Sequence, residues 1–381
     1  MANNKTFKIK NGLSAGRYLG SNGTETAGTV GYNIGSAEYD GVSFDITQST
    51  VTHNLTFKPD GTKMYVVERS NDSVYQYSLS TAYDVSTASY DSKSFSFATQ
   101  EIDPYGIVFN DDGTSMYTIG YGSDAVYQYT LSTAYDVSTA SYASKSLDVS
   151  SEDTIPTNVT FKADGTSLYI IGSSNDAVYQ YNLTTAFDVS TGSYASKSLD
   201  FSSEDTNANG FAFNADGTKC FVVGNTSDKV HQYSLTTAYD ISTASYDSVS
   251  FDLSSQDTNP FGLAFSNDGT KMYVLGSDDF VYQYSTALLT QTLDLSTGNT
   301  FSFTPSGATD ILFSNPPASG TAVGFTLEVN NTGGYALTWP SSVKWPSGTA
   351  PTATASKELY TFVTTDGGTT YYGKLAGSDI A

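Results

Sequence analysis

Side chains that could do chemistry recur along this chain at equal steps. Glu101, Asp153, Asp205 and Asp257 follow one another at intervals of 52 residues, and Ser49 holds the corresponding position in the first copy. Oxygen ligands that converge on one face could bind Ca2+, and polar groups beside aromatic rings could bind a sugar. A local role is the alternative, because aspartate side chains accept hydrogen bonds from backbone N–H groups in turns. The sequence leaves both interpretations open and predicts no other metal site or cofactor.

The remaining candidate side chains are few. His53 aligns with Tyr105 of the next copy, near the entrance of a predicted inner strand, and both residues join the candidate ligand-binding set. Cys220 takes a position that methionine or leucine holds in the other copies, so we expect it in the core. His231 replaces a tyrosine, so we expect a structural role for it as well. One cysteine and two histidines leave neither an intrachain disulfide nor a Cys/His zinc cluster.

No catalytic set stands out among the repeats. Catalysis usually requires an asymmetric group, such as a nucleophile with its base or two carboxylates in different environments. The repeats described below are expected to form a ring around a central channel. Two aligned series of positions should face this channel, and neither series contains an acid. They are Asn54, Gly106, Asn158, Gly210 and Gly262, then Thr56, Val108, Thr160, Ala212 and Ala264. We therefore predict that the protein is not an enzyme, with a glycan-cleaving propeller as the catalytic alternative.

The elements that carry these residues repeat five times. The tripeptide Asp-Gly-Thr starts at Asp60, Asp112, Asp164, Asp216 and Asp268. A glutamine follows each tripeptide, at Gln76, Gln128, Gln180, Gln232 and Gln283. Each copy holds four strand-like segments, and a short Asp-Gly turn between two strands is typical of a hairpin. Because four strands in such a repeat are typical of a propeller blade, we predict an all-β, five-bladed β-propeller over residues 42–285.

Counting strands also predicts how the ring closes. A fourth strand follows only four of the five copies, and the missing one is predicted upstream at residues 42–46. The residues before it, 38–40, resemble residues 89–91, which precede the fourth strand of the first copy. An N-terminal strand that completes the last blade removes an open edge that would invite aggregation.

The blades resemble a known family of repeats. Residues 262–274, Gly-Leu-Ala-Phe-Ser-Asn-Asp-Gly-Thr-Lys-Met-Tyr-Val, are similar to the YVTN-like β-propeller repeats. The resemblance covers residues 42–285 and implies the propeller fold. It implies little about function, since propellers serve binding, scaffolding and catalysis alike.

Both ends of the chain depart from the repeat. Residues 1–41 carry Lys5, Lys8, Lys10 and Arg17 before the first acid, Glu25. This segment is either a solvated tail or a docking arm for an acidic partner surface. Residues 286–381 alternate short strands with Pro/Gly turns, which predicts a small β-sandwich or jelly-roll-like module.

Three segments of the C-terminal module, residues 313–320, 339–346 and 366–372, resemble the C-terminal modules of tailed-phage virion proteins, especially tail fibres of marine phages. Residues 5–13 look like the start of such proteins. The resemblance implies a non-catalytic, tail-fibre-like virion protein that presents its propeller to a host surface, with glycan as the expected receptor. A head fibre or capsid decoration protein is the alternative.

Charge and hydropathy limit the classes of partner that the protein can have. The chain has 17 basic and 39 acidic residues, a net charge of −22, which argues against binding to nucleic acid or to an anionic membrane. We find no run of 18 apolar residues and no apolar N-terminal region, so we expect neither a membrane span nor a signal peptide. We expect an oligomer in the virion, assembled in the host cytoplasm. It would contact other virion proteins through its N-terminal arm and a host glycan or protein through its propeller.

Overall fold

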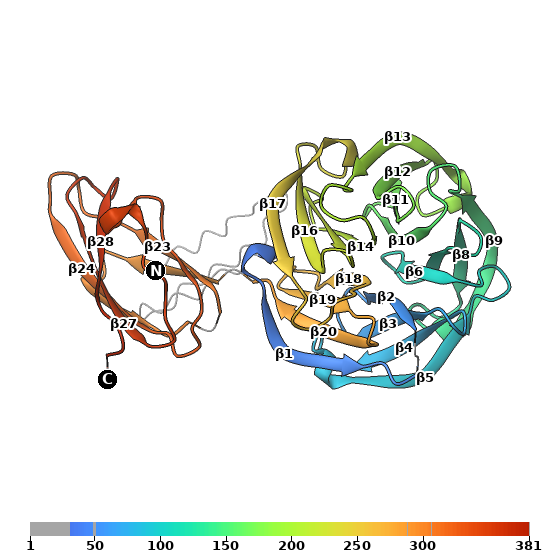
Figure 1. The fold of residues 1–381 in the computed structure, drawn as a ribbon, viewed down its shortest axis with the longest axis horizontal. Coiled ribbons are helices and arrows are strands. Elements are labelled where there is room, and N and C mark those ends of the chain that lie inside the picture. The colour runs from blue at the N-terminus through green and yellow to red at the C-terminus, as the bar shows by residue number, and fades with distance from the viewer. Residues whose placement is uncertain (1–30, 49–50, 288, 306, 381) are drawn as a thin grey trace, which may run out of the picture. The chain divides into compact units, whose positions relative to one another are not determined.

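The computed structural model describes residues 31–48, 51–287, 289–305 and 307–380. Tertiary contacts divide the chain into two units, one of them Gly31–Thr286 and the other containing Ala287–Ala381. The first unit is a β-propeller of five four-stranded sheets (Figure 1), and the second contains two further sheets. The predicted all-β class and five-bladed propeller are confirmed.

Each blade is an antiparallel four-stranded sheet, and the first strands of neighbouring blades contact one another around the centre. Blade 1 contains β2 (Thr52–Phe57), β3 (Lys63–Glu68), β4 (Ser73–Leu79) and β5 (Ala88–Ser96). Blade 2 contains β6 (Pro104–Phe109), β7 (Ser115–Gly120), β8 (Ala125–Leu131) and β9 (Ala140–Asp148). Blade 3 contains β10 (Pro156–Phe161), β11 (Ser167–Gly172), β12 (Ala177–Leu183) and β13 (Gly192–Asp200). Blade 4 contains β14 (Ala208–Phe213), β15 (Lys219–Gly224), β16 (Lys229–Leu235) and β17 (Ala244–Asp252).

Blade 5 combines strands from both ends of the propeller. It contains β18 (Gly262–Phe265), β19 (Lys271–Leu275), β20 (Phe280–Ser285) and the N-terminal strand β1 (Glu38–Asp45). β1 pairs antiparallel with β20 and places Phe44 opposite Val281. The predicted closure by an N-terminal strand is confirmed, although the strand starts at Glu38 rather than at residue 42.

The N-terminal contribution to blade 5 is larger than a single strand. Residues 32–40, Tyr-Asn-Ile-Gly-Ser-Ala-Glu-Tyr-Asp, repeat the pattern of residues 83–91, Tyr-Asp-Val-Ser-Thr-Ala-Ser-Tyr-Asp. They form the 3-10 helix η1 (Ile34–Ser36), the counterpart of η2 (Val85–Thr87), and Ile34 is fully buried. The propeller therefore begins at Gly31, earlier than the predicted residue 42. The proposed docking residues Lys5, Lys8, Lys10 and Arg17 lie outside the described residues.

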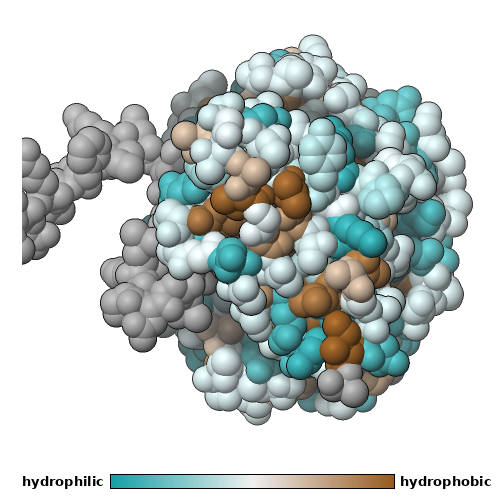
Figure 2. Space-filling model, turned by 90° about the vertical axis from the view of Figure 1, so that its left-hand side faces the viewer, coloured by the Kyte–Doolittle hydropathy of each residue, from teal (hydrophilic) through white to brown (hydrophobic). Residues whose placement is uncertain are grey.

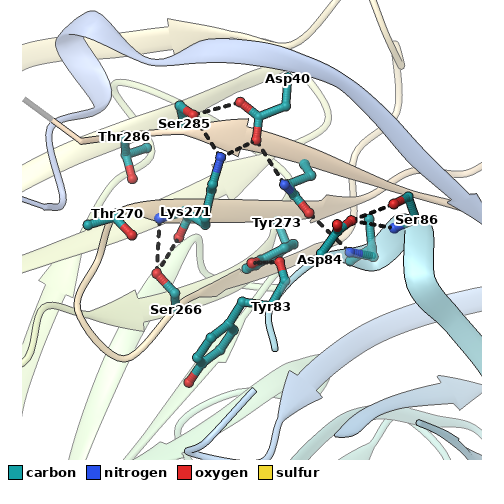
Figure 3. A network of polar contacts seen from close by, with 12 residues as sticks. Asp40, Tyr83, Asp84, Ser86, Ser266, Thr270, Lys271, Tyr273, Ser285 and Thr286 are labelled. Carbon is teal, nitrogen blue, oxygen red and sulfur yellow. Dashed lines mark hydrogen bonds and ion pairs between the residues drawn. The ribbon is translucent and has the colours of Figure 1, made fainter. Parts of the chain in front are cut away.

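A polar cluster holds β1 against the last blade (Figure 3). Asp40 accepts hydrogen bonds from Lys271 Nζ (2.5 Å), Gln283 Nε2 (2.9 Å) and Ser285 Oγ (2.6 Å). In blade 1, Asp91 accepts the equivalent bonds from a lysine and from the repeated glutamine. The N-terminal segment thus reproduces the internal contacts of an ordinary blade.

Two contacts also recur at four of the five junctions between neighbouring blades, and the junction of blades 4 and 5 has Phe221 in place of the tyrosine. Between blades 5 and 1, the Tyr273 hydroxyl donates to Tyr83 O (2.5 Å), and Gln283 Oε1 accepts from Val85 N (3.1 Å) (Figure 3). The tyrosine contact recurs between Tyr65 and Tyr135, Tyr117 and Phe187, and Tyr169 and Tyr239. The glutamine contact recurs between Gln76 and Val137, Gln128 and Val189, and Gln180 and Ile241. The repeated glutamine is therefore a blade-joining residue.

The second unit is a β-sandwich. One sheet has the order β21 (Leu289–Asp294), β23 (Thr309–Ser314), β25 (Leu337–Thr338). The other has the order β22 (Thr300–Phe303), β24 (Val323–Asn330), β27 (Lys357–Thr364), β28 (Tyr371–Gly377), β26 (Val343–Lys344). Leu293 and Ile311 of the first sheet share a buried core with Phe325, Tyr360 and Phe362 of the second. Among the described residues, no helix is long and apolar enough to cross a membrane.

Candidate functional site

The predicted ring of acids lies on one face of the propeller, here called the acidic face. This face consists of the loops that enter the inner strands, such as residues 97–103, and the turns between second and third strands, such as residues 121–124. Glu101, Asp153, Asp205 and Asp257 are only 0%, 1%, 3% and 8% exposed. A cation or sugar arriving from solvent would not reach these carboxylates without displacing the loops around them.

The structure shows what the four carboxylates bind instead. Each accepts a hydrogen bond from the backbone N–H two residues later and another from the turn between the second and third strands of its own blade. For Glu101 the donors are Asp103 N and Gly122 N, both at 2.9 Å. The donors in the other blades are Ile155 and Asn175 for Asp153, Asn207 and Ser227 for Asp205, and Asn259 and Ser277 for Asp257. This geometry supports the turn-capping interpretation.

Blade 1 shows that the capping carboxylate is needed even where the repeat lacks it. Position 49 is serine, but Glu68, at the end of β3, is fully buried and accepts from Ser70 N (3.0 Å) and Asn71 N (2.6 Å). The other blades have glycine at that position, and a Cβ on Gly172 would lie 2.0 Å from the Asp153 carboxyl carbon. The acid has therefore moved from the loop to the strand in blade 1, and the glycine has disappeared with it.

His53 and Tyr105 lie inside the central channel, at the end toward the acidic face. His53 is 6% exposed, and its ring centroid is 4.2 Å from that of Tyr105 and 4.5 Å from that of Phe261. Burial and the nearby positive charge of Arg69 lower the pKa of His53 to about 4, so the ring is neutral at pH 7. The aligned residues Thr157 and Asn209 are buried as well. This layer fills the channel toward the acidic face.

A cavity of about 360 Å3 opens at the other end of the channel. We call this side the mouth face, which carries the Asp-Gly-Thr turns and the loops with the 3-10 helices. The last residue of each inner strand is a half-buried phenylalanine that lines the cavity. These residues are Phe57, Phe109, Phe161, Phe213 and Phe265.

The repeated turn motif packs against the aromatic residues at the mouth of the cavity. In blade 3, Asp164 Oδ1 accepts from Thr166 N (3.0 Å) and Thr166 Oγ1 (2.6 Å), which closes the turn. Gly165 between them has φ +70°, and a Cβ there would lie 2.3 Å from the ring of Phe187. Phe187 in turn packs on Phe161, with centroids 5.4 Å apart. The same arrangement recurs with Tyr32, Tyr83, Tyr135 and Tyr239 in the other blades.

Polar groups line the cavity together with the aromatic rings. Asn54, Thr56, Asn158 and Thr160 contribute to its lining. Asn54 is 2% exposed, and its Nδ2 has no hydrogen-bond partner among the described residues. The lining contains one carboxylate and one lysine, Asp111 and Lys162, and no histidine. Burial raises the pKa of Asp111, followed by repulsion from Asp112.

The sequence carried a signal for this cavity that our expectations did not use. Each lining phenylalanine stands three residues before the aspartate of an Asp-Gly-Thr turn, so the five recur at 52-residue steps. Residue type alone does not distinguish these positions from ordinary core positions. Only the joint observation of a repeated aromatic and a repeated turn indicates the rim of a channel.

Other candidate positions are structural or lack ligand geometry. Cys220 is fully buried in the core, as expected, and burial raises the pKa of its thiol. His231 is buried and lies 2.9 Å from Ser227 Oγ through its Nε2. In the part of the chain that the structure describes, no three His, Cys, Asp or Glu side chains are placed to hold a metal ion.

Hydrophobic side chains also reach the surface of the C-terminal unit. Val363 and Tyr372 are cross-strand partners on β27 and β28 and are 45% and 62% exposed. Trp339 packs against Trp345 (5.2 Å between centroids) and Tyr360 (4.6 Å). On the side of the molecule in Figure 2, hydrophobic residues gather in a few patches among near-neutral and hydrophilic ones.

Fold and site together define a closed β-propeller with a blind, aromatic-lined cavity. The family model described as "Lactonase, 7-bladed beta-propeller" matches residues 25–249. The chain belongs to this family, with five blades where the family's description has seven. A search of curated proteins found no match.

Several solved structures are similar to this chain. A functionally unknown protein from Desulfotomaculum acetoxidans is 13% identical, with a TM-score of 0.37, over 66% of this chain and 73% of that one. A "putative 6-phosphogluconolactonase" from Bacteroides uniformis is 13% identical, with a TM-score of 0.40, over 60% and 66%. One from Bacteroides fragilis is 13% identical, with a TM-score of 0.40, over 62% and 67%.

Proposed function

We propose that this protein is a non-catalytic, tail-fibre-like virion protein whose propeller recognises a host-surface glycan. The observation that carries the recognition step is the cavity of the mouth face. It is concave, and aromatic rings and polar groups both line it. Binding pockets for small organic groups combine apolar walls, which supply contact area, with polar groups, which supply orientation.

The ionisable groups of the cavity support binding over catalysis. Asp111 and Lys162 belong to the lining, and neither has a second acid, a histidine or a nucleophile paired with it there. General acid–base chemistry on a glycan requires two carboxylates in different environments. The carboxylates of Glu101, Asp153, Asp205 and Asp257 on the acidic face are committed to turns.

Lactone hydrolysis is the competing function, and the family's description favours it. A phosphorylated lactone would also need cationic groups at its phosphate, because anion recognition depends on Arg, Lys or backbone N–H groups. One lysine lines the cavity of a chain whose net charge is −22. We therefore place lactonase and glycan-cleaving activity second to binding.

The virion role is supported by the C-terminal segments that resemble phage modules. Residues 339–346 form part of the aromatic cluster of the sandwich, with Trp339 and Trp345 in contact. A head fibre or capsid decoration protein would carry the same segments. In each case other virion proteins would dock on the N-terminal arm, and the protein would be an oligomer there.

The test uses purified full-length protein and intact phage particles. Antibodies against the protein should label an external fibre, and the protein added in excess should prevent particles from adsorbing to host cells. Incubation with host polysaccharide or with simple lactones should release no product. Product release, or label confined to the capsid surface with unimpaired adsorption, would contradict the proposal.

A further inference from the structure

We propose that a pocket of the acidic face, between blades 1 and 2, binds the basic N-terminal segment, residues 5–17, of a second copy of this chain. The pocket has a volume of about 880 Å3, and its lining includes Val51, Arg69, Asp72, Ile102, Tyr121 and Asp124. We call it the blade 1–2 pocket. The choice of a second copy as the occupant rests on the proposed function, which expects an oligomer.

Exposed hydrophobic side chains distinguish this pocket from the rest of the propeller. Six large hydrophobic side chains are exposed among the described residues of the propeller. Three are tyrosines that recur on the outer strands: Tyr39, Tyr142 and Tyr194. The other three, Val51, Ile102 and Tyr121, are 37%, 67% and 49% exposed, and all of them line the blade 1–2 pocket. A partner arriving from solvent can therefore contact them directly.

The exposed residues of the pocket also depart from the fivefold repeat. The position of Ile102 is threonine in the other four copies, and that of Tyr121 is arginine, serine or asparagine. A residue that the blade needs for folding would recur in every copy, because the blades share their loop and turn geometry. Large apolar side chains that stay in solvent add nothing to the core. Their clustering at one place is typical of an interaction surface.

The charges of the pocket favour a cationic partner. Asp103 holds the one basic residue of the lining, since its Oδ2 accepts from Arg69 Nη2 (3.0 Å). Asp72 and Asp124 are half-buried, and neither forms an ion pair with another described residue. Burial and then repulsion from neighbouring carboxylates raise the pKa of both. A positive charge placed between them would relieve this repulsion.

The N-terminal segment has the complementary chemistry. Residues 5–10 read Lys-Thr-Phe-Lys-Ile-Lys, so basic and apolar side chains lie close together in sequence. Four basic residues precede the first acid of the chain: Lys5, Lys8, Lys10 and Arg17. Basic groups beside apolar ones match the carboxylates and the exposed apolar residues of the blade 1–2 pocket.

A second copy suits this contact because the segment and the pocket are different surfaces. Such a heterologous contact leaves each pair of copies with one unused segment and one unused pocket, so further copies can join in a ring or a filament. Repeated addition of this kind is what a fibre-like protein requires.

The first experiment uses a mixture of unlabelled and isotope-labelled full-length protein. Carbodiimide cross-linking followed by mass spectrometry should join Lys5, Lys8 or Lys10 of one copy to Asp72 or Asp124 of another. Sedimentation should show self-association that weakens about tenfold when NaCl is raised from about 0.05 M to about 0.5 M, because salt screens the attraction.

Variants that restore the repeat test the pocket without disturbing the fold. Ile102→Thr with Tyr121→Ser gives blade 2 the residues of blade 3. Asp72→Asn with Asp124→Asn removes two charges and keeps a residue type that tolerates φ values of 50° and 51°. Each pair of changes should weaken self-association about tenfold, which corresponds to about 1.4 kcal/mol.

The matched control removes the same acid from the equivalent turns of blades 3 and 4. Asp176→Asn with Asp228→Asn should leave self-association unchanged, because no exposed apolar side chains lie beside these turns. Reversing the charge of the segment with Lys5→Glu, Lys8→Glu and Lys10→Glu should abolish self-association. Mixing this variant with the Ile102→Thr, Tyr121→Ser variant should restore pairs, since each supplies the surface that the other lacks.

Three results would each overturn the inference. They are a wild-type protein that stays monomeric at low salt, cross-links confined to single copies, and equal weakening by the control pair. None of these results would affect the labelling and adsorption tests of the proposed function. Labelling confined to the capsid surface with unimpaired adsorption would remove the fibre role and leave this contact between copies standing.

Discussion

The two faces of the propeller carry the same fivefold repeat and use it differently. On the acidic face, the repeated side chains are carboxylates, and the structure buries them in turns within each blade. On the mouth face, the repeated side chains are aromatic, and they remain half-buried around a cavity. By residue type alone, the charged residues are the better candidates for chemistry. Solvent accessibility, rather than residue type, distinguishes residues of a candidate binding site from residues that only support the fold.

The departures from the repeat sharpen this difference. On the acidic face, the exception in blade 1 is compensated, because Glu68 caps the turn that the serine at position 49 leaves without its acid. Deep in the cavity, the exception at Asn54 is uncompensated and leaves a donor without a partner. A compensated exception indicates a structural requirement.

Removing the N-terminal strand should disrupt the acidic face and the mouth face together. It should have the largest effect on stability of all the changes considered. A protein lacking residues 1–47 loses β1 and Tyr32, which exposes the edge of β20 and opens the mouth. It should aggregate and lose cooperative melting. A protein lacking only residues 1–30 keeps the whole propeller unit and should melt with the same propeller transition. Equal behaviour of the two truncations in sedimentation and calorimetry would contradict the closure.

The capping role of the acidic face can be tested by copying blade 1 into blade 3. Asp153→Ser should cost about 3 kcal/mol, because buried N–H groups lose a charged acceptor. Gly172→Glu should cost at least as much, because its side chain meets the Asp153 carboxylate. The double variant should recover about 2 kcal/mol relative to the sum of the single changes.

The control for this cycle pairs changes in different blades. Asp257→Ser combined with Gly172→Glu should be additive in chemical denaturation, because the two side chains belong to separate turns. Additivity within blade 3 as well would show that the glutamate of blade 1 does not replace the missing acid.

A change at the mouth should have a smaller effect. Tyr239 donates its hydroxyl hydrogen to Ala215 O (2.9 Å) and so ties the rim to an Asp-Gly-Thr turn. Tyr239→Phe should cost about 1 kcal/mol and leave the fold unchanged, since blade 3 already has Phe187 at this position. Denaturation curves measure the cost, and a loss above several kcal/mol would mean that the rim is not independent of the propeller core.

The smallest effect should appear in the pH dependence of stability. Hydrogen bonds from Lys162 and Thr166 lower the pKa of Asp164 on the mouth face to about 2. That stabilisation is present above the unfolded pKa and is lost as pH falls from about 4 toward 2. On the acidic face, burial and then repulsion from Asp205 and Asp153 raise the pKa of Asp176. Ionised Asp176 therefore destabilises the fold, and stability rises as pH falls through its raised pKa.

The melting temperature should consequently be highest at mildly acidic pH and fall below about pH 4. Asp176→Asn should reduce the rise on acidification, and Asp164→Asn should reduce the fall at lower pH. Added salt at neutral pH should stabilise the wild type more than Asp176→Asn, because it screens the repulsion. A melting temperature that is constant between pH 4 and 7 would show that the two faces do not differ in this way.

Much of the fold was predictable because a propeller blade is a local structure. The Asp-Gly-Thr turn, the glutamine and four alternating segments lie within one repeat, so their pairing depends on neighbours in sequence. The closure was also predictable, since a strand was missing at one end and present at the other. The residue at which the propeller starts was not predictable, because few residues are identical between 32–37 and 83–88.

The candidate site was predictable only in part. The carboxylates were correctly expected on one face together with the turns between second and third strands. Their exposure to solvent was not predictable, since burial of Glu101 or Asp153 depends on how the turn between the second and third strands folds back over the loop. The family to which the chain belongs did not emerge from the expectations either, because the blade pattern alone is common to many propellers.

By itself, the sequence determined the number of blades, the turn chemistry and the closing strand, because each of these rests on contacts within one repeat or on a count of repeats. Only the tertiary structure decided where a ligand could bind. The cavity exists because five inner strands lie around one axis, with the buried layer of His53, Thr157 and Asn209 toward the acidic face and the five phenylalanines toward the mouth face. Its depth, its closed floor and the unpartnered Asn54 amide depend on the radius of that ring, which no single repeat encodes.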